Sequence, residues 1–432
     1  MSAATQAMTA DATTYTTPRL RECPDCGQFQ TVPPLPPAAR AMCLRCDAVL
    51  RHTRRDPLSL PLALNATGLI LFGLGIGMTM MSVSTAGQQH VASLISGPVG
   101  LEQHGLWSLS VVVLITTAAA PLARLLCMVT VLVGLRLPNP PGELPAIYAW
   151  VERLRPWSMI EIFMLGLFVA YVRLSAMVQI DLGTAVYALG ALILVMAAAD
   201  FMLDRQAVWE AMEHHPPRLR RKHKPRTAGL LGRPLSRMGC DTCGLVSRAI
   251  PGAECSRCGS ALRHRKPDSI ARTWALSVAA LILYIPANIY PVLTVIRFGS
   301  GHPSTILGGV QELIETGMWP LAALVFFASI AVPVLKLIGL GVLLVTTQLG
   351  VQARLEDRTV LYRIVDAIGR WSMIDIFMES ILVALVQFGT VVTVNPGVGA
   401  VAFSAVVILT MFAAQSFDPR LMWDRADGPP HE

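Results

Sequence analysis

The sequence predicts an all-α polytopic membrane protein of two tandem units, each a small four-cysteine ribbon followed by four transmembrane helices, about eight in total. The first observation is composition, because 53% of the 432 residues are apolar and 15% are charged. The second is that several stretches run for about 20 residues with at most one charge, the length that crosses a bilayer. The third is an internal repeat, in which Cys23 recurs as Cys240 and Cys43 as Cys255.

The repeat extends over most of the chain. Its best-matched segment is Trp157-Ser-Met-Ile-Glu-Ile-Phe-Met164, which recurs as Trp371-Ser-Met-Ile-Asp-Ile-Phe-Met378 with one Glu/Asp exchange. A shared apolar composition does not produce such a match, so we expect both units to have the same architecture.

The elements follow one another in the same order in both units. The segment 1–20 is rich in Ala and Thr and lacks the basic and apolar regions of a cleavable signal peptide. We predict a disordered tail at 1–20, zinc ribbon 1 at 21–55, transmembrane unit 1 at 56–204, a basic cytoplasmic linker at 205–237, zinc ribbon 2 at 238–266, transmembrane unit 2 at 267–418 and a tail at 419–432. The predicted spans are 60–83, 106–135, 158–180, 183–203, 271–296, 318–349, 372–394 and 398–417.

The distribution of basic residues predicts the orientation. Nine Lys or Arg lie between Arg205 and Arg237, whereas 84–105 has none, and Arg297 is the one basic residue in the connections predicted on that side. Lys and Arg are retained on the cytoplasmic side during insertion, so we expect both termini and both ribbons to be cytoplasmic. A basic segment beside membrane spans sets topology or contacts anionic headgroups more often than it binds nucleic acid.

Eight of the nine cysteines form two sets of metal-ligand type. The first set has the spacing C-x2-C-x16-C-x2-C and the second C-x2-C-x11-C-x2-C. Four thiolates from two tight turns suit tetrahedral zinc and leave no open position for water, so one structural zinc ion per ribbon is predicted, with iron as the open alternative. A thiol-redox role is the other alternative. The predicted ligands are Cys23, Cys26, Cys43 and Cys46, and Cys240, Cys243, Cys255 and Cys258.

Charged residues inside the spans are candidates for function, because burying a charge in a bilayer is costly. Lys336 lies mid-span one turn after Pro333, and its counterpart Arg124 follows Pro121 in the same way. Each cation either helps to satisfy a backbone carbonyl freed by the proline or pairs with a neighbour for packing.

Asp375 and Glu379 are spaced i, i+4 and share a helix face, with Lys336 as a candidate partner. Their like charges repel unless one is protonated or a cation intervenes. In the first unit Glu161 matches Asp375, whereas Leu165 replaces Glu379. Glu161 and Asp375 also lie near the predicted cytoplasmic helix ends, where an anchoring role is the plain alternative.

The segment Tyr284-Ile-Pro-Ala-Asn288-Ile-Tyr-Pro291 is predicted to resist a regular helix. Broken helices at membrane depth line cavities or bury against protein, so Asn288 and Pro291 are candidates for the wall of a substrate path. No Walker loop, nucleophile elbow or H-E-x-x-H motif is present, so no enzymatic activity is predicted.

Together these motifs resemble the paraquat-inducible protein A (PqiA/LetA) family. The resemblance rests on the tandem ribbons, Pro-Ala-Asn-Ile-Tyr-Pro at 286–291, P-x-x-K at 333–336 and the paired W-S-M-I-[ED]-I-F-M segments. It implies a multi-pass protein of the bacterial inner membrane that works with a periplasm-spanning MCE-domain protein and moves phospholipid or other hydrophobic molecules between the inner and outer membranes. The first unit lacks the prolines and Asn of 286–291, so the second unit is the expected centre of transport.

Three other functions stay open at the level of sequence. The first alternative is a scaffold that recruits the MCE protein, and the second is a membrane thiol-redox protein. The third is a metal transporter, which is disfavoured because the spans lack clustered metal ligands. Within the transport hypothesis, Lys336, Asp375 and Glu379 are predicted to couple to protons.

Overall fold

The computed structural model describes residues 18–85, 88–175, 179–214, 235–297, 300–385 and 392–427. It divides into two compact units, which we call the ribbon unit and the helical unit. The ribbon unit comprises Met1–Ala63, Thr130–Ala149 and Ala198–His264, and the helical unit comprises Leu64–Val129, Trp150–Ala197 and Arg265–Glu432. Parts of both sequence repeats are therefore present in each unit.

The ribbon unit contains short antiparallel hairpins around the cysteines. The strands are β1 (Arg19–Glu22), β2 (Phe29–Val32), β3 (Arg40–Met42), β4 (Val49–His52), β8 (Ser236–Gly239) and β9 (Val246–Ala249), paired β1–β2, β3–β4 and β8–β9. A glycine with φ of 68° to 75° follows three of the four C-x-x-C turns, and Asp47, with φ of 55°, follows the fourth. Asp tolerates this left-handed conformation better than most residues do, so all four turns close in the same way.

The remaining elements are helices and two further sheets. The helices are α1 (Ser59–Gly77), α2 (Ser96–Gln103), α3 (Trp107–Leu114), α4 (Ala120–Gly134), α5 (Leu144–Leu154), α6 (Ile160–Ser175), α7 (Thr184–Met202), α8 (Arg205–His214), α9 (Ser269–Ile289), α10 (Ile306–Glu315), α11 (Trp319–Phe326), α12 (Val332–Gln348), α13 (Leu355–Ile368), α14 (Ile374–Leu385), α15 (Val398–Ser416) and α16 (Arg420–Asp427). The sheets consist of β5 (Met81–Thr85), β6 (Gln88–Ala92) and β7 (Gln179–Leu182), and of β10 (Leu293–Arg297), β11 (Ser300–Ser304) and β12 (Val392–Pro396).

Among the described residues, seven helical segments are long and apolar enough to cross a membrane. They are Ser59–Gly77, Trp107–Gly134, Leu144–Val172, Thr184–Met202, Ser269–Ile289, Trp319–Gln348 and Val398–Asp427. The eighth predicted span, 372–394, begins on α14 and continues into 386–391, outside the described residues. The chain is a multi-pass membrane protein.

Several spans end earlier than hydropathy predicts. The predicted spans 60–83 and 271–296 reach into β5 and β10, which follow α1 and α9 and form the central strands of the orders β6-β5-β7 and β11-β10-β12. These strands are rich in Val, Thr and Ile. Such β-branched residues favour strands, yet in a hydropathy profile they extend the apolar run of the helix before them.

In each repeat, one glycine lies where the last span meets the three-stranded sheet. A Cβ on Gly183 would lie 2.1 Å from the Thr79 carbonyl oxygen, and one on Gly397 would lie 2.1 Å from that of Pro291. Both contacts are far below van der Waals distance. The two repeats therefore use the same close backbone approach at this junction.

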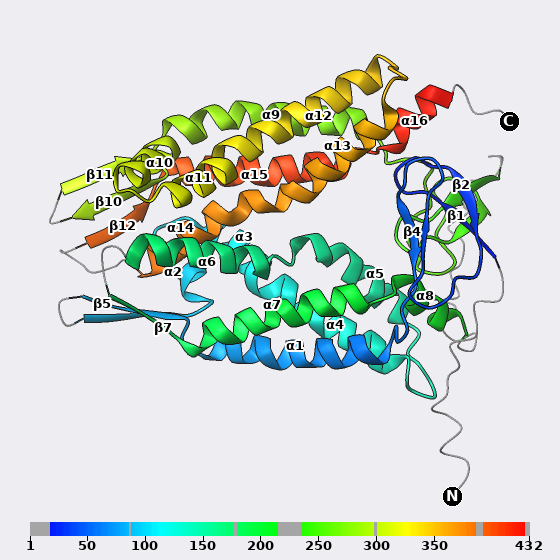
Figure 1. The fold of residues 1–432 in the computed structure, drawn as a ribbon, viewed down its shortest axis with the longest axis horizontal. Coiled ribbons are helices and arrows are strands. Elements are labelled where there is room, and N and C mark those ends of the chain that lie inside the picture. Colours follow the sequence, from blue (N-terminus) through cyan, green and yellow to red (C-terminus); the bar gives the residue numbers. More distant parts are fainter. Residues whose placement is uncertain are drawn as a thin grey trace, which may run out of the picture. The chain divides into compact units, whose positions relative to one another are not determined.

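The core of the helical unit brings the two repeats together. α6 and α14, which carry the repeated W-S-M-I-[ED]-I-F-M segment, pack through Phe163 and Phe377, with ring centroids 5.8 Å apart. Gly166 faces Phe377 so closely that a Cβ would lie 3.0 Å from its side chain. Around this pair, α9, α12 and α15 lie side by side (Figure 1).

A π-helical turn interrupts the long second span of each repeat. Ile115–Ala119 separates α3 from α4, and Phe327–Ala331 separates α11 from α12. Each turn lies just before the proline of P-x-x-[RK]. Because proline lacks an N–H and its ring crowds the preceding turn, the wider turn accommodates it without ending the helix.

Candidate metal centres and the intramembrane polar site

The structure brings together the four cysteines of each predicted set. Their sulfur atoms all lie within 4.8 Å of one another, and all eight residues are buried. In the first centre Cys23 and Cys46 are 3.5 Å apart, as are Cys26 and Cys43. In the second the Cys240–Cys258 and Cys243–Cys255 separations are 3.4 and 3.6 Å.

This geometry fits a tetrahedral thiolate site. Bonds of about 2.3 Å from zinc to sulfur place tetrahedral sulfurs about 3.8 Å apart, slightly wider than the separations here. A disulfide needs sulfurs about 2 Å apart, so these separations exclude disulfides within the clusters. Both clusters can therefore hold a metal ion, and four tetrahedral cysteine sulfurs suit zinc or iron.

The thiols of a cluster cannot all ionise easily without a cation. Hydrogen bonding with Cys26 lowers the pKa of Cys23 to about 5, and hydrogen bonding with Cys240 lowers that of Cys255 to about 7. In the same clusters, interactions with neighbouring thiols raise the pKa of Cys26 and Cys243 above the ordinary value. Because adjacent thiolates repel one another, a bound divalent ion is what would allow all four to be deprotonated.

Both ribbons contact α8, which follows the fourth span of the first repeat. Asp204 begins this helix, and its Oδ1 accepts hydrogen bonds from the backbone N–H groups of Gln206 and Ala207 at 3.0 and 3.1 Å. Trp209 is buried and packs edge-on against Tyr148, with ring centroids 4.8 Å apart. The predicted linker 205–237 thus begins with a helix, and 215–234 lie outside the described residues.

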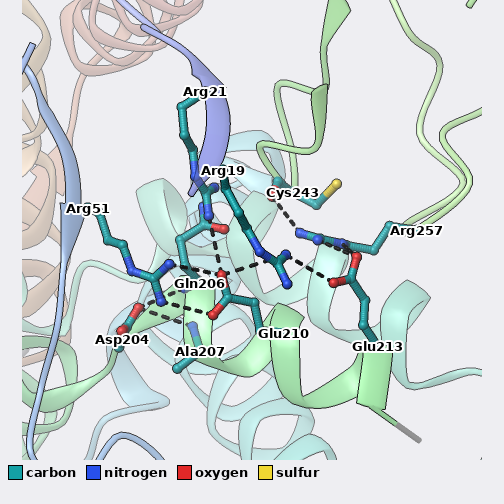
Figure 2. Close-up of polar contacts among 10 residues, drawn as sticks. All are labelled: Arg19, Arg21, Arg51, Asp204, Gln206, Ala207, Glu210, Glu213, Cys243 and Arg257. Atoms are coloured by element: carbon teal, nitrogen blue, oxygen red, sulfur yellow. Dashed lines mark hydrogen bonds and ion pairs between the residues drawn. The ribbon is translucent and has the colours of Figure 1, made fainter. Parts of the chain in front are cut away.

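Glu210 on α8 is the centre of a group of arginines from ribbon 1 (Figure 2). It accepts a bidentate pair of hydrogen bonds from Arg51 at 3.0 and 2.9 Å. Arg21 and Arg19 lie 3.5 and 3.7 Å from the same carboxylate. Burial lowers the pKa of Arg21 to about 10, so it stays a cation at neutral pH.

Glu213, one turn later, connects α8 to both ribbons. It accepts a hydrogen bond from Arg19 of ribbon 1 at 3.0 Å and one from Arg257 Nε of ribbon 2 at 2.8 Å. Burial opposes its ionisation, but Arg257 and Arg19 together outweigh that effect and hold the pKa of Glu213 below its ordinary value. The carboxylate is therefore ionised at neutral pH.

Lys336 lies in the helical unit and is 1% exposed. Its Nζ donates hydrogen bonds to Thr410 Oγ1 on α15 at 2.8 Å and to the Gly369 carbonyl at 3.5 Å. The expected pairing of Lys336 with Asp375 or Glu379 is not among these contacts, and its hydrogen bonds go to a hydroxyl and a carbonyl group of neighbouring elements instead.

Asp375 and Glu379 lie on α14 and are both buried, at 9% and 3% exposure. The i, i+4 spacing places both on one face of this helix. Glu379 Oε1 has no hydrogen-bond partner among the described residues. A buried carboxyl oxygen without a hydrogen-bond partner is uncommon in folded proteins.

The segment 284–291 is more regular than predicted. α9 continues through Pro286 and ends at Ile289, so the expected break is a helix end. Asn288 Nδ2 donates to the Tyr284 carbonyl at 2.8 Å, an interaction within the last turns of the helix. The Pro291 carbonyl accepts from the Gly399 N–H at 3.1 Å, which ties the start of α15 to the end of α9.

The matching residues of the first repeat are placed differently. Arg124 is buried at 8% on α4, like Lys336 on α12, whereas Glu161 is exposed on the first turn of α6 and Asp375 is buried. Glu161 therefore fits the anchoring alternative better than a buried functional role.

α8 and its acidic residues are not among the elements predicted from the sequence. The signal lies in the repeat, because Asp204 and Trp209 recur in its second copy as Asp418 and Trp423. On α16, Trp423 is buried and its Nε1 donates to Thr359 Oγ1 at 3.1 Å. Each repeat therefore ends in a short helix with a buried Trp.

Comparisons with known proteins agree with this repeat. The family model described as paraquat-inducible protein A matches twice, at residues 58–213 and 270–427, so each match ends near the end of α8 or α16. "Intermembrane transport protein PqiA" of Escherichia coli strain K12 is 33% identical over 411 residues, 95% of this chain and 97% of that protein. "Lipophilic envelope-spanning tunnel protein A" of the same strain is 29% identical over 94% of this chain and 91% of that protein.

A third relative covers less of the chain. "Probable intermembrane transport protein" of Haemophilus influenzae is 34% identical over 151 residues, 35% of this chain and 36% of that protein. No solved structure matches the chain significantly.

Proposed function

We propose, because this chain belongs to the paraquat-inducible protein A family, that it is an inner-membrane subunit of a system transporting lipid or other hydrophobic molecules between the membranes of the bacterial envelope. The names of two relatives, an intermembrane transport protein and a lipophilic envelope-spanning tunnel protein, support this assignment. The proposed partner is a periplasm-spanning MCE-domain protein. We assign no catalytic activity to the chain.

The observation that carries the proposal is the set of buried polar side chains in the second repeat. Lys336, Thr410 and Glu379 come from three helices of the helical unit and are each at most 3% exposed. Charged groups inside membrane spans are costly and recur at substrate and ion pathways. We propose that Lys336, Asp375 and Glu379 couple lipid movement to protons, and that Asn288 and Pro291 lie beside the lipid path.

The proposed topology places both ribbons, with one zinc ion in each, and both termini in the cytoplasm. It is supported by the nine basic residues of 205–237 and by the absence of Lys and Arg from 84–105. In the proposed arrangement the zinc ions are structural, because four cysteine ligands leave no coordination position for a substrate.

Lipid transfer by reconstituted protein tests the proposal. We expect Lys336→Met and Glu379→Gln to lower transfer of labelled phospholipid to the MCE-domain partner at least tenfold. Glu161→Gln is the control, because Glu161 is exposed on the matching helix of the first repeat and its loss leaves transfer unchanged.

Unchanged transfer in Lys336→Met and Glu379→Gln, with both variants folded, would rule out a transport role for these side chains. A scaffold would give a different pattern. Binding of the partner would then depend on the ribbons and connections, and no substitution of a buried polar residue would change lipid transfer.

A further inference from the structure

We propose that ribbon 1 and α8 build the outer shell of the second metal centre, so that the two metal centres of this chain are energetically coupled. The contacts that carry this inference all lie within the ribbon unit. They surround Cys240, Cys243, Cys255 and Cys258 from two separate parts of the chain. The inference does not depend on the transport function.

The first cysteine turn of the second centre packs directly on ribbon 1. The Gly239 N–H, next to Cys240, donates to Glu22 Oε2 on β1 at 2.6 Å. A Cβ on Gly239 would lie 2.6 Å from that same oxygen and 2.8 Å from Glu22 Cβ, so a larger residue would displace Glu22. Glu22 is in turn adjacent to Cys23, a ligand of the first centre.

The same turn also packs on α8. Gly244, which follows Cys243, has a φ of 68°. A Cβ there would lie 3.0 Å from Arg21 Nη1 of ribbon 1 and 3.1 Å from Gln206 Nε2 of α8. Both sides of this cysteine turn therefore contact groups outside ribbon 2.

The second cysteine turn is held through Arg257, which lies between Cys255 and Cys258. Arg257 Nη1 donates to the Cys243 carbonyl at 3.4 Å, which links the two cysteine turns of the centre. Its Nε donates to Glu213 on α8 at 2.8 Å, and its side chain is 5% exposed. Glu213 is thus a positioning residue that orients a group spanning both turns.

The first centre has a different environment. Gln30 of its own ribbon donates from Nε2 to Cys43 Sγ at 3.0 Å, and its amide oxygen accepts from the Leu44 N–H at 3.2 Å. A neutral amide within the ribbon thus supports the first centre, whereas guanidinium groups fixed by α8 and ribbon 1 flank the second. Outer-shell partners of this kind change metal affinity by about 10- to 100-fold.

These contacts connect metal binding at one centre to metal binding at the other. A small ribbon without its metal has too little core to stay folded, so loss of the first ion displaces Arg21 and Glu22 from the second centre. Thermodynamic linkage makes the effect reciprocal, so loss of the second ion must lower the affinity of the first centre for its ion by the same factor.

Zinc release from the full-length protein in detergent tests the coupling. Zinc is loaded to saturation, and its transfer to 4-(2-pyridylazo)resorcinol is followed by absorbance for wild type, Cys43→Ser and Cys255→Ser. Cys43→Ser keeps only the second centre intact, and Cys255→Ser keeps only the first. If the centres are independent, the time course of the wild-type protein equals the sum of the time courses of these two variants. We expect the wild-type protein to release zinc at least tenfold more slowly than that sum, and equality of the two would overturn the proposal.

A second test uses Glu213→Gln, which keeps all eight cysteine ligands. It therefore remains informative even if a cysteine variant misfolds. We expect Glu213→Gln to accelerate zinc release at least threefold, beginning at the second centre and followed by the first, because the two centres are coupled. Asp424→Asn is the matched control, because it breaks the Arg265–Asp424 pair of the helical unit and touches neither centre. Equal release by Glu213→Gln, Asp424→Asn and wild type overturns the role of Glu213.

Discussion

Glu210 is an acidic residue in a basic ribbon unit, and its environment explains why it is buried. Its side chain is 4% exposed and faces Arg51, Arg21 and Arg19 at 2.9 to 3.7 Å. Three guanidinium groups gathered without an acid would repel one another in a site with little access to water. The bidentate geometry with Arg51 offsets part of the desolvation cost of both ions.

Replacing Glu210 by Gln keeps the size of the side chain and removes its charge. We expect the ribbon unit to lose about 3 to 5 kcal/mol of stability, because Arg51 and Arg21 stay buried without this carboxylate. The measurement is chemical denaturation followed through Trp209, which is buried on the same helix.

Glu143→Gln is the control for this substitution, because Glu143 is exposed in the same unit. A Glu210→Gln protein as stable as this control would show that the arginine group does not stabilise the docking of ribbon 1 on α8.

At the level of elements, each repeat joins its three-stranded sheet to its last span through one glycine. The junctions at Gly183 and Gly397 have the same close approach to a backbone carbonyl, although the sequences around them differ. A carbonyl belonging to the sheet junction cannot move aside as a flexible side chain would. The approach therefore excludes every residue that has a Cβ.

Gly397→Ala is expected to destabilise the helical unit by about 1 to 3 kcal/mol, because the new methyl group forces the start of α15 away from Pro291. Thermal unfolding in detergent measures the effect. Gly190→Ala is the matched control on α7, where a Cβ meets nothing within 4 Å and alanine favours the helix. Equal melting temperatures for the two variants would contradict the close approach.

The short helices α8 and α16 are equivalent in the repeat but differ in their contacts. Both follow the last span of a repeat and bury a tryptophan. On α16, Asp424 pairs with Arg265, and both residues belong to the helical unit. α8 carries two glutamates that meet four arginines, so it has become the common support of both ribbons.

At the level of the whole molecule, the two units depend on different forces. The helical unit has a large apolar core drawn from both repeats, whereas the two ribbons are short hairpins around eight cysteines that pack beside α8 in the ribbon unit. Ribbons of this kind need their metal to stay folded, whereas the helices do not.

Removal of metal is therefore expected to unfold the two ribbons selectively. After treatment with a strong zinc chelator, we expect all eight ribbon cysteines to react with a maleimide probe and the ribbons to become sensitive to protease. The helices keep their helix content, which circular dichroism measures. A large loss of helix content on chelation would contradict separate stabilisation of the ribbons and the helices.

Much of the architecture was predictable from local patterns. The metal ligands follow from the paired C-x-x-C spacing, and the spans follow from runs of apolar residues as long as a bilayer is thick. The repeat predicted that α6 and α14 are equivalent. The two three-stranded sheets were not predicted, because β-branched residues at the end of an apolar run are as hydrophobic as the residues of a membrane span.

The contacts that distinguish this chain needed the tertiary structure. Arg51 and Glu210 are 159 residues apart, Arg19 and Glu213 are 194 apart, and Lys336 and Thr410 are 74 apart. Sequence alone determined the two repeated units, their cysteine ligands and their apolar spans, because covalent spacing and local hydrophobicity suffice for these. The partners of each charge were decided by packing, since a buried ion pairs with whichever opposite charge or dipole the fold brings within reach.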